Sequence, residues 1–515
     1  MSSTHAEKHV VALAYQAWGH TRPLVQLSAR LVKMRSLHVT FFTTNAFFDK
    51  VLVELARSFE LGEEAYASRV RVISLGESVL LSGEAVDEGF RRACVKLVAG
   101  QELQCVKTGK VHAALPPPRA AIIDFFAVNP IAAIKEASKN SVKVYAWYSA
   151  MTTSAFTHIV SDEYGGPGNI RLKAEAVAKQ TGKPFTEAVV DLLFVPKGRV
   201  LDIPGLPPLS DYEMAPQDFP MPVEVMAQLF PRLYETIEVC DGVFFISPAS
   251  YEPEALETCK TWLRKTGRSG YVCGPLLPQP HGLAAESNEK KQSQQSAEIV
   301  ELLDATLKTS GEKSLLYISF GSFFWPAKSP EKLWAFLDVV MELNIPFILS
   351  MASPLAGPLP DEISTKVKAY GKGLVSPWTP QQLILEHPAT GWFVTHGGHN
   401  SVVESISAGV PMIAWPFNAD QPLNALRISE VLKIGYELIE VRTGHGTHPL
   451  HRNGRKPVCT IEAVKAEAKA VLTRAFDEDG AKKRERVLAL TRAFEQEWAE
   501  GGASWKDVNA FLDSI

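Results

Sequence analysis

Residues 378–421 read WTPQQLILEHPATGWFVTHGGHNSVVESISAGVPMIAWPFNADQ, and this stretch decides the fold expected for the second half of the chain. Residues 391–395 form a short apolar run that favours a β-strand, and a polar loop over residues 396–400 precedes a helical segment. A second buried strand follows from Met412. The stretch therefore predicts two βα units joined by polar loops.

The helix within this stretch has clear start and stop signals. Ser401 and Glu404 form an S-x-x-E capping-box pattern, whereas Gly409 and Pro411 predict the end of the helix. The glycine pair at residues 397–398 lets the backbone approach a ligand closely, and the first N–H groups of a helix lack partners within the helix. This end of the unit therefore suits the phosphate groups of a nucleotide.

Strand-like apolar runs alternate with helical patterns along almost the whole chain, which predicts α/β architecture with parallel sheets. The chain has 515 residues, too many for one core, so we expect two facing Rossmann-like domains with a ligand cleft between them. The predicted strands are residues 10–15, 38–43, 70–75, 120–124, 142–148 and 242–246 in the first domain, and 314–320, 346–350, 373–376, 391–395 and 412–415 in the second.

A polar stretch separates the two sets of strands. Residues 282–297 are rich in Ser, Gln, Glu and Lys, and this composition cannot pack a core. We therefore place the N-terminal domain at residues 1–275, a linker at 276–300, and the C-terminal, nucleotide-binding domain at 301–490. Residues 491–515 are expected to form a C-terminal helix that packs back on the N-terminal domain.

Composition and charge argue against several classes of function. The net charge is −4 and the Lys and Arg residues do not cluster, so no nucleic-acid partner is expected. The N-terminus lacks a secretory signal and no run reaches about 18 apolar residues, so we expect a cytoplasmic protein without a transmembrane segment. Six scattered cysteines fit a reducing compartment. We expect the chain to act as a monomer.

Two residues of the first domain indicate acid–base chemistry. His20 follows the strand at residues 10–15, before a helix expected to start near residues 21–23, and Asp124 ends the strand at residues 120–124. If these strands are parallel neighbours, the two side chains meet at one edge of the sheet. A neutral imidazole oriented by a carboxylate is well matched to proton removal near pH 7. The alternatives are an ordinary loop histidine and a helix-capping or surface carboxylate.

The stretch 378–421 resembles the signature box of the UDP-glycosyltransferases, a family that includes plant and fungal natural-product glucosyltransferases. The segments AWGHTRP around His20 and IIDFF around Asp124 are similar to the family's catalytic-histidine loop and aspartate-bearing strand. The resemblance is strongest over residues 314–430 and poorest over 155–235. The matching residues of the box are Trp378, Pro380, Gln381, His387, Pro388, His396, Gly397, Asn400, Ser401, Glu404, Ser405, Ala408, Gly409, Val410, Pro411, Asp420 and Gln421.

The resemblance implies a GT-B fold and an inverting hexosyltransferase that needs neither a metal nor a cofactor. His20 would be the base and Asp124 would orient it. The sugar would pass from a UDP-sugar to a hydroxyl of a small lipophilic acceptor and give a β-glycoside. Because the family usually associates Gln421 with glucose, the implied donor is UDP-glucose.

The resemblance also assigns donor-binding roles. It implies that Trp378 stacks on uracil, that Gln381 lies beside the ribose, and that Glu404 accepts hydrogen bonds from the ribose hydroxyls. His399 departs from the family, where plant members usually have Trp, although this position mainly offers its backbone N–H to the sugar. The remaining implied donor contacts are His396, Gly398, Asn400, Ser401 and Ser322 for the diphosphate, and Asp420, Gln421 and Ser149 for the sugar.

Several of these residues have simpler explanations. Trp378 could be a hydrophobic staple for the next helix, and Glu404 could be only the capping-box partner. His396 and His399 could suggest a metal site, but no third ligand stands at a familiar spacing. The basic insertion at residues 442–456 is predicted to be a surface loop, with a regulatory contact as the alternative.

Aromatic residues near the predicted base favour a lipophilic acceptor, although each could belong to the core. A sterol or membrane-lipid glucosyltransferase is an alternative function. A non-catalytic UDP-sugar-binding homologue is another, which the presence of His20 and Asp124 disfavours. An NAD-dependent oxidoreductase is disfavoured because no G-x-G-x-x-G follows the first strand. The candidate acceptor-pocket residues are Trp18, Phe125, Phe126 and Trp147, with Tyr148, Phe156 and Trp325 as further candidates.

Overall fold

The computed structural model describes residues 8–15, 17–77, 84–218, 220, 223–278 and 296–515. The chain divides into two compact α/β units, each built around its own parallel sheet. The first unit comprises Met1–Val195, Pro222–Ala285 and Glu497–Ile515, and the second comprises Pro196–Met221 and Glu286–Gln496. Most of the predicted linker at residues 276–300 lies outside the described residues.

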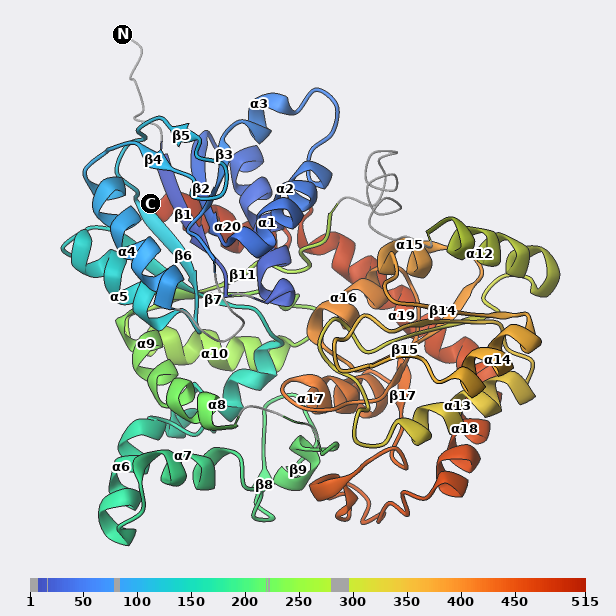
Figure 1. Cartoon of the computed structure of the whole chain (residues 1–515). Helices are drawn as coiled ribbons and strands as arrows, with labels where there is room; N and C mark the ends of the chain where they lie inside the picture. Colours follow the sequence, from blue (N-terminus) through green and yellow to red (C-terminus); the bar gives the residue numbers. More distant parts are fainter. Residues whose placement is uncertain (1–7, 16, 78–83, 219, 221–222, 279–295) are drawn as a thin grey trace. The chain divides into compact units, whose positions relative to one another are not determined.

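Seven parallel strands form the sheet of the first unit, in the order β11-β10-β7-β6-β1-β2-β3 (Figure 1). The chain runs outward from β1 to β3 on one side and from β6 to β11 on the other, so β1 and β6 flank the switch point where ligands bind in such sheets. The strands are β1 Lys8–Leu13, β2 Leu37–Thr43, β3 Val70–Ser74, β6 Ala120–Asp124, β7 Lys143–Tyr148, β10 Gly242–Phe245 and β11 Ser269–Val272.

Helices cover both faces of this sheet, with α1 and α2 on one face and α4 and α5 on the other (Figure 1). Burial on both faces explains why its strands are almost continuously apolar. The helices are α1 Trp18–Met34, α2 Asn45–Arg57, α3 Glu64–Ala67, α4 Glu84–Val98, α5 Val128–Ala137, α6 Ile170–Thr181, α7 Phe185–Leu193, α8 Val223–Leu229, α9 Leu233–Val239, α10 Pro253–Lys265 and α20 Ala503–Ser514, with 3-10 turns η1 Thr152–Thr157, η2 Asp162–Tyr164 and η4 Phe230–Arg232.

The second unit contains a six-stranded parallel sheet in the order β14-β13-β12-β15-β16-β17. Here β12 and β15 flank the switch point. The strands are β12 Leu315–Ser319, β13 Phe347–Ser350, β14 Gly373–Ser376, β15 Thr390–Thr395, β16 Met412–Ala414 and β17 Gly435–Glu437. The helices are α12 Ser296–Ser310, α13 Pro330–Glu342, α14 Asp361–Tyr370, α15 Gln381–Glu386, α16 His399–Ser407, α17 Gln421–Leu426, α18 Ile461–Ala475 and α19 Glu478–Glu497, with short turns η3 Asp211–Met214, η5 Arg427–Val431 and η6 Gly444–Thr447.

Alternate residues of β12 face a core that α13 and α18 close. Leu316 and Ile318 belong to this core, together with Phe320 just beyond the strand. Trp325 is also part of it, 2% exposed and packed edge-on against Phe320 at 5.6 Å between ring centroids. Its suggested place in an acceptor pocket is therefore wrong, because the turn after β12 folds the indole back into the unit.

The structure confirms strands at all eleven predicted positions and adds several short ones. β11 and β17 are edge strands of four and three residues, and both contain glycine, so their pattern was too weak to recognise. Two antiparallel two-residue ladders are also new, β4 (Leu103–Gln104) with β5 (Val111–His112) and β8 (Val200–Leu201) with β9 (Leu209–Ser210).

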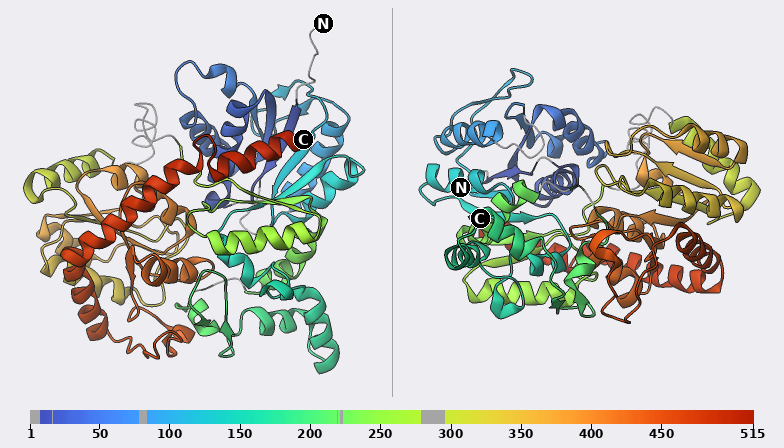
Figure 2. Two further views of the ribbon diagram at one scale, coloured as in Figure 1. Left: turned by 180° about the vertical axis from the view of Figure 1, so that it is seen from behind. Right: turned by 60° about the horizontal axis from the view of Figure 1, so that its bottom comes forward.

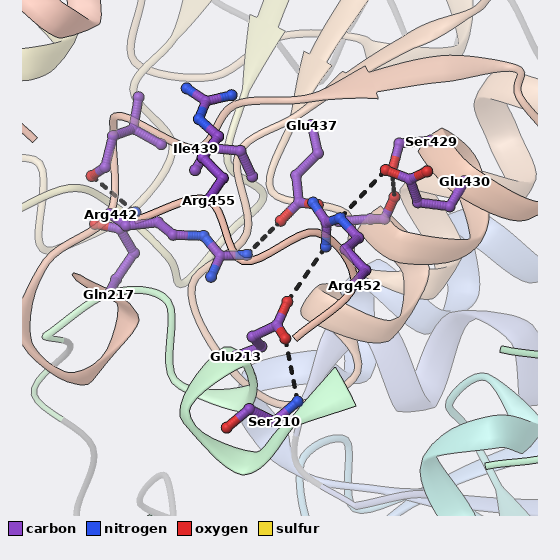
Figure 3. Close-up of polar contacts among 12 residues, drawn as sticks. Ser210, Glu213, Gln217, Ser429, Glu430, Glu437, Ile439, Arg442, Arg452 and Arg455 are labelled. Atoms are coloured by element: carbon purple, nitrogen blue, oxygen red, sulfur yellow. Dashed lines mark hydrogen bonds and ion pairs between the residues drawn. The ribbon is translucent and has the colours of Figure 1, made fainter. Parts of the chain in front are cut away.

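The segment Pro196–Met221, which we call the strap, was assigned to the first domain from sequence but packs in the second unit. Figure 3 shows how Glu213 of the strap meets Arg452: Arg452 Nη1 donates to Glu213 Oε2 at 3.3 Å and the His451 N–H donates to Oε1 at 2.8 Å. Gln217 Nε2 donates to the carbonyl of Val441 at 3.1 Å. These side chains are buried, so the ion pair and hydrogen bonds fix the strap.

The insertion at residues 442–456 is correspondingly more than the predicted surface loop. Arg442 is 2% exposed and donates from Nη2 to Glu437 at 2.7 Å, and Arg452 donates to the other oxygen of the same carboxylate at 2.7 Å (Figure 3). The two arginines hold the pKa of Glu437 below its usual value although burial opposes this. Most of the other residues of the insertion are exposed, among them His448, whose ring stacks on that of Tyr212 at 3.9 Å.

We predict that Glu213→Ala lowers the free energy of unfolding of the second unit by about 3 kcal/mol, because it leaves buried Arg452 with one partner fewer and two N–H groups without an acceptor. Thermal and urea unfolding measure the effect. Glu495→Ala, on an exposed position of α19, is the control and should change stability by less than about 0.5 kcal/mol. Equal effects of the two variants would contradict the anchoring role of Glu213.

The C-terminal helix α20 packs against the first sheet (Figure 2). The ring of Phe511 meets those of Tyr145 on β7 and Phe244 on β10 edge-on, with centroids at 5.0 Å and 4.9 Å. Lys260 forms an ion pair with Asp507, whose carboxylate also accepts the Val272 N–H at 2.7 Å. Apolar and charged contacts thus both tie residues 503–514 to this unit.

Candidate active site

The two predicted catalytic residues lie side by side at the switch point of the first sheet. Asp124 is the last residue of β6, which pairs in parallel with β1, and His20 lies in the first turn of α1 after β1. His20 Nδ1 and Asp124 Oδ2 are 2.8 Å apart. Asp124 is wholly buried and its other oxygen accepts the Phe126 N–H at 3.0 Å, whereas the His20 side chain is 22% exposed.

This geometry fixes the role of each imidazole nitrogen. Asp124 accepts the proton of His20 Nδ1, so Nε2 carries the lone pair that can take a proton from a substrate. Helix α1 begins at Trp18, three residues before the predicted start, because the Ala17 carbonyl already accepts the N–H groups of His20 and Thr21 at 3.0 Å. His20 is therefore held by a helix turn rather than by a loose loop.

Aromatic rings surround the imidazole of His20. The rings of Tyr15 and Phe126 lie 5.8 Å from it, and that of Phe125 lies parallel at 6.4 Å. Burial, followed by the nearby charge of Asp124, raises the pKa of Tyr15 to about 12, so its phenol stays protonated. This wall is largely apolar, with few groups that could compete with a substrate hydroxyl for His20.

The four acceptor-pocket candidates separate into core and wall residues. Trp147 is wholly buried on β7, and its indole N–H donates to the carbonyl of His20 in α1 at 3.1 Å. It therefore supports α1, and its prediction as a pocket residue is wrong. Phe125 is also buried, at 2% exposure. Phe126 and Trp18 are half-buried and remain candidates for substrate contact. The wrong assignment arose because the pattern of a two-sided buried strand does not show which aromatic reaches solvent.

Ser149 follows β7, two residues beyond Trp147, the register partner of Asp124. Its hydroxyl oxygen is buried and has no hydrogen-bond partner among the residues that the structure describes. A buried hydroxyl without a partner is costly, so this atom is available for a ligand hydroxyl.

In the second unit, the loops after β12 and β15 meet around the imidazole of His396. A Cβ on Gly321 would lie 2.9 Å from this ring and one on Gly398 would lie 2.4 Å from its Nε2, so only glycine fits at either position. Gly321 also has φ +75°, which favours glycine. Phe324 stacks on the other side with centroids 5.7 Å apart. The tight fit explains the glycine requirement at Gly321.

Burial lowers the pKa of His396 to about 4, so the ring is neutral near pH 7. Its Nδ1 is buried and has no hydrogen-bond partner within the described ranges. The ring is therefore a neutral polar group rather than a fixed positive charge.

The lowered pKa predicts that acid destabilises the second unit. The folded state disfavours protonated His396, so the unfolded state binds more protons between pH 6.5 and about 4, and stability falls as pH decreases through this window. Between pH 7 and pH 5, wild type should lose about 2 kcal/mol that His396→Phe retains. Urea unfolding at the two pH values tests this difference, and identical losses in the two proteins would contradict it.

Helix α16 begins at His399 with Gly398 as its N-cap, so the predicted capping box of Ser401 and Glu404 is wrong. Both residues lie inside the helix, and this releases the Glu404 carboxylate from the backbone. Gln381 Nε2 donates to it and also lies 3.3 Å from Ser401 Oγ. Glu404 is 4% exposed. The structure therefore brings together three of the predicted donor-binding residues.

Tyr317 on β12 completes this group, although no motif marked it in the sequence. Its hydroxyl donates to Gln381 Oε1 at 3.3 Å and lies 2.7 Å from the hydroxyl of Thr379. Trp378, the residue before Thr379, is 37% exposed, which is an unusually high exposed fraction for so large a side chain. Because Pro380 caps α15, Trp378 does not stand at the position of a hydrophobic staple.

The other predicted sugar-binding residues lie around the start of α17. Asp420 Oδ2 accepts the backbone N–H of His399 at 3.2 Å, which joins α16 to α17. Gln421 is 1% exposed, and its side-chain carbonyl accepts the N–H groups of Phe417 and Asn418 at 2.9 Å and 3.2 Å. These bonds orient the amide nitrogen of Gln421 for a ligand. Asn400 is half-buried at the helix start, and Ser322 is exposed beside Gly321.

No three His, Cys, Asp or Glu side chains in the part of the chain that the structure describes come together as ligands for a metal ion. None of the helices described there is long and apolar enough to span a membrane.

Comparisons with known proteins match this geometry. A family model described as UDP-glucoronosyl and UDP-glucosyl transferase matches residues 225–439. UDP-glycosyltransferase eriJ from Hericium erinaceus is 29% identical over 531 residues, which cover 98% of this chain and 98% of that protein. The chain is therefore similar to UDP-glycosyltransferases over almost its whole length. A second relative, anthocyanidin 3-O-glucosyltransferase 5 from Manihot esculenta, is 25% identical over 99% of this chain and 96% of that protein.

The fold of the chain is also that of solved UDP-glycosyltransferases. Medicago truncatula UGT71G1 complexed with UDP-glucose superposes with a TM-score of 0.68 at 18% identity, over 100% of this chain and 99% of the other. The expected GT-B fold of two Rossmann-like domains is confirmed. The family model and the Hericium erinaceus relative are named for UDP-dependent glycosyl transfer, and the solved structure is complexed with UDP-glucose.

Proposed function

We propose that this protein is a UDP-glycosyltransferase that transfers glucose from UDP-glucose, with inversion, to a hydroxyl of a small lipophilic acceptor. The observation that carries the proposal is the hydrogen bond between His20 Nδ1 and Asp124, which leaves Nε2 free to act as a base beside an apolar wall. We place the reaction in the cytosol, since the six cysteines are free thiols and five of them are buried.

The reaction is a single displacement. His20 Nε2 takes the proton of the acceptor hydroxyl as the oxygen attacks C1 of the α-linked sugar. The bond between C1 and the phosphate oxygen breaks, and its electron pair leaves with UDP. Asp124 stabilises the imidazolium that forms, and the proton then passes to solvent. Attack from the face opposite UDP gives a β-glycoside.

The second unit holds the donor. Trp378 stacks on uracil, and Glu404, oriented by Gln381, accepts the ribose hydroxyls. The N–H groups of the first turn of α16, with neutral His396, meet the charge that develops on the diphosphate. This preorganised set replaces a metal ion in the proposal. Further contacts come from Gly398, Asn400, Ser401 and Ser322 to the diphosphate and from Asp420, Gln421, Ser149 and the backbone of His399 to the sugar.

The acceptor is proposed to be aromatic or terpenoid in character. The half-buried ring of Phe126 lies 5.5 Å from Tyr15 and 5.8 Å from Phe230, so an apolar surface extends from His20 along the first unit. Such a wall favours a flat lipophilic alcohol or phenol. The name of the anthocyanidin glucosyltransferase relative supports the same chemical class.

The test incubates the full chain in the presence of EDTA with one donor and a panel of acceptors. The donors are UDP-glucose, UDP-galactose and UDP-glucuronic acid, and the acceptors are phenols, terpenoid alcohols and sterols. UDP release and glycoside mass report turnover, and NMR of the product reports its anomeric configuration. A β-glucoside formed in EDTA supports the proposal. An α-glycoside, loss of activity in EDTA, or preference for another sugar would each overturn the corresponding part, and activity only on sterols in vesicles would favour a membrane-lipid acceptor.

A further inference from the structure

A second buried carboxylate of the first unit holds the segment that follows β7. Glu252, the N-cap residue of α10, is 0% exposed. Its oxygens accept the N–H groups of Thr152 and Thr153 at 2.7 Å and 2.8 Å and the hydroxyls of Thr153 and Ser247. All four partners are donors, so the ionised carboxylate fits the site and holds these groups together.

The clamp holds the segment that follows β7. Thr152 and Thr153 open the turn η1, which begins three residues after Ser149. Trp147 pairs in register with Asp124, so this segment leaves the sheet beside the catalytic residues. Glu252 comes from the start of α10, after β10, and fixes the segment from the far side of β7.

Further contacts carry this support towards His20. Ser154 on η1 lies 2.7 Å from the hydroxyl of Tyr148, and the ring of Tyr148 packs 4.7 Å from that of Phe125. Phe125 in turn stacks parallel to His20. Glu252, η1 and the aromatic wall thus form one contiguous set of contacts.

Two hydroxyls in the held segment have no partner of their own. Ser149 Oγ and Thr152 Oγ1 are both buried, and neither hydrogen-bonds to any residue that the structure describes. Unpaired buried hydroxyls destabilise a loop, so this segment would relax if it were not held from elsewhere. The clamp at Glu252 maintains the arrangement.

We infer that Glu252 is a positioning residue: it does not touch substrate, but it holds residues 149–153 so that Ser149 meets a hydroxyl of the transferred sugar and the wall beside His20 keeps its shape. The inference rests on the proposed function for the role of Ser149. It predicts that loss of the clamp weakens productive binding of the sugar and the acceptor, and leaves binding of UDP alone unchanged.

The test compares Glu252→Gln with Glu254→Gln, an exposed position on the same helix. The glutamine amide keeps the length of the side chain but turns a donor against the N–H groups of η1. We expect Glu252→Gln to speed hydrogen–deuterium exchange over residues 149–157 and to raise the KM of UDP-glucose and acceptor about tenfold, with the Kd of UDP within about twofold of wild type. Glu254→Gln should match wild type.

Thr153→Val, which removes one donor to the clamp, provides a milder variant in case Glu252→Gln does not fold, and it should shift the same quantities in the same direction. Unchanged exchange, or wild-type KM values with only a lower kcat or melting temperature, would overturn the inference. If wild type itself forms no glycoside, the proposed function fails. In that case, hydrogen–deuterium exchange over residues 149–157 and the ratio of the affinities for UDP-glucose and UDP still decide the role of Glu252.

Discussion

His20→Ala is expected to lower kcat/KM for glycoside formation by about 10³-fold and to leave the Kd of UDP unchanged. The imidazole is the group that takes the acceptor proton in the proposed reaction, and its Nδ1 is committed to Asp124 at 2.8 Å. The nucleotide contacts belong to residues of the second unit, so their affinity does not depend on this ring. Steady-state kinetics and calorimetric titration with UDP measure the two quantities.

Asp124→Asn should show the same pattern with a loss of about 10²-fold or more, because an amide can present the wrong tautomer of His20 and does not stabilise its cation. His112→Ala, on β5 of the same unit, is the matched control and should retain activity. A His20→Ala protein that keeps more than about a tenth of wild-type kcat/KM would exclude the proposed base.

Glu404→Ala is expected to raise the Kd of UDP by about 10²-fold. The variant removes a buried carboxylate that we propose accepts both ribose hydroxyls, and each hydrogen bond to a charged group contributes about 1.5 kcal/mol or more. It also leaves the amide of Gln381 without its charged partner. Calorimetric titration with UDP, without acceptor, measures the loss.

Glu386→Ala, which removes an exposed carboxylate at the end of α15, is the control for the change in net charge and should bind UDP like wild type. The Glu404→Ala protein should keep its melting temperature within a few degrees. If the two variants bound UDP equally well, Glu404 would have only a structural role and the donor site would lie elsewhere.

The positions of the strands and of the catalytic pair could be predicted because both depend on local pattern. Continuous apolar runs mark parallel strands, and polar residues at their carboxyl ends mark the ligand edge. His20 and Asp124 follow strands that prove to be neighbours. β17 and β11 escaped prediction because edge strands of three or four residues have little pattern.

Details of the donor site required three-dimensional information. The S-x-x-E pattern suggested that a helix starts at Ser401, but α16 already starts at His399. The backbone N–H of His399 is bound by Asp420, a contact that the local sequence does not reveal. The polar group of Tyr317, Gln381 and Glu404 joins strand β12 to helices α15 and α16, and no sequence spacing encodes it.

The assignment of the strap to the second unit could not be predicted from the sequence either. Residues 196–221 precede several elements of the first unit in sequence, yet Glu213 pairs with Arg452, more than 200 residues later. Attractions between charges so distant along the chain leave no local signature. The basic insertion at residues 442–456 therefore looked like a surface loop until its buried partners were known.

The central claim is that the His20–Asp124 pair activates an acceptor for transfer from a UDP-sugar held by the second unit. The most direct test measures UDP binding and glycoside formation in parallel for wild type and His20→Ala, with UDP-glucose and the best acceptor of the panel. The account predicts equal UDP affinity, with β-glucoside formed by wild type alone. Glycoside formed at a comparable rate by the variant, or failure of wild type to bind UDP, would contradict it.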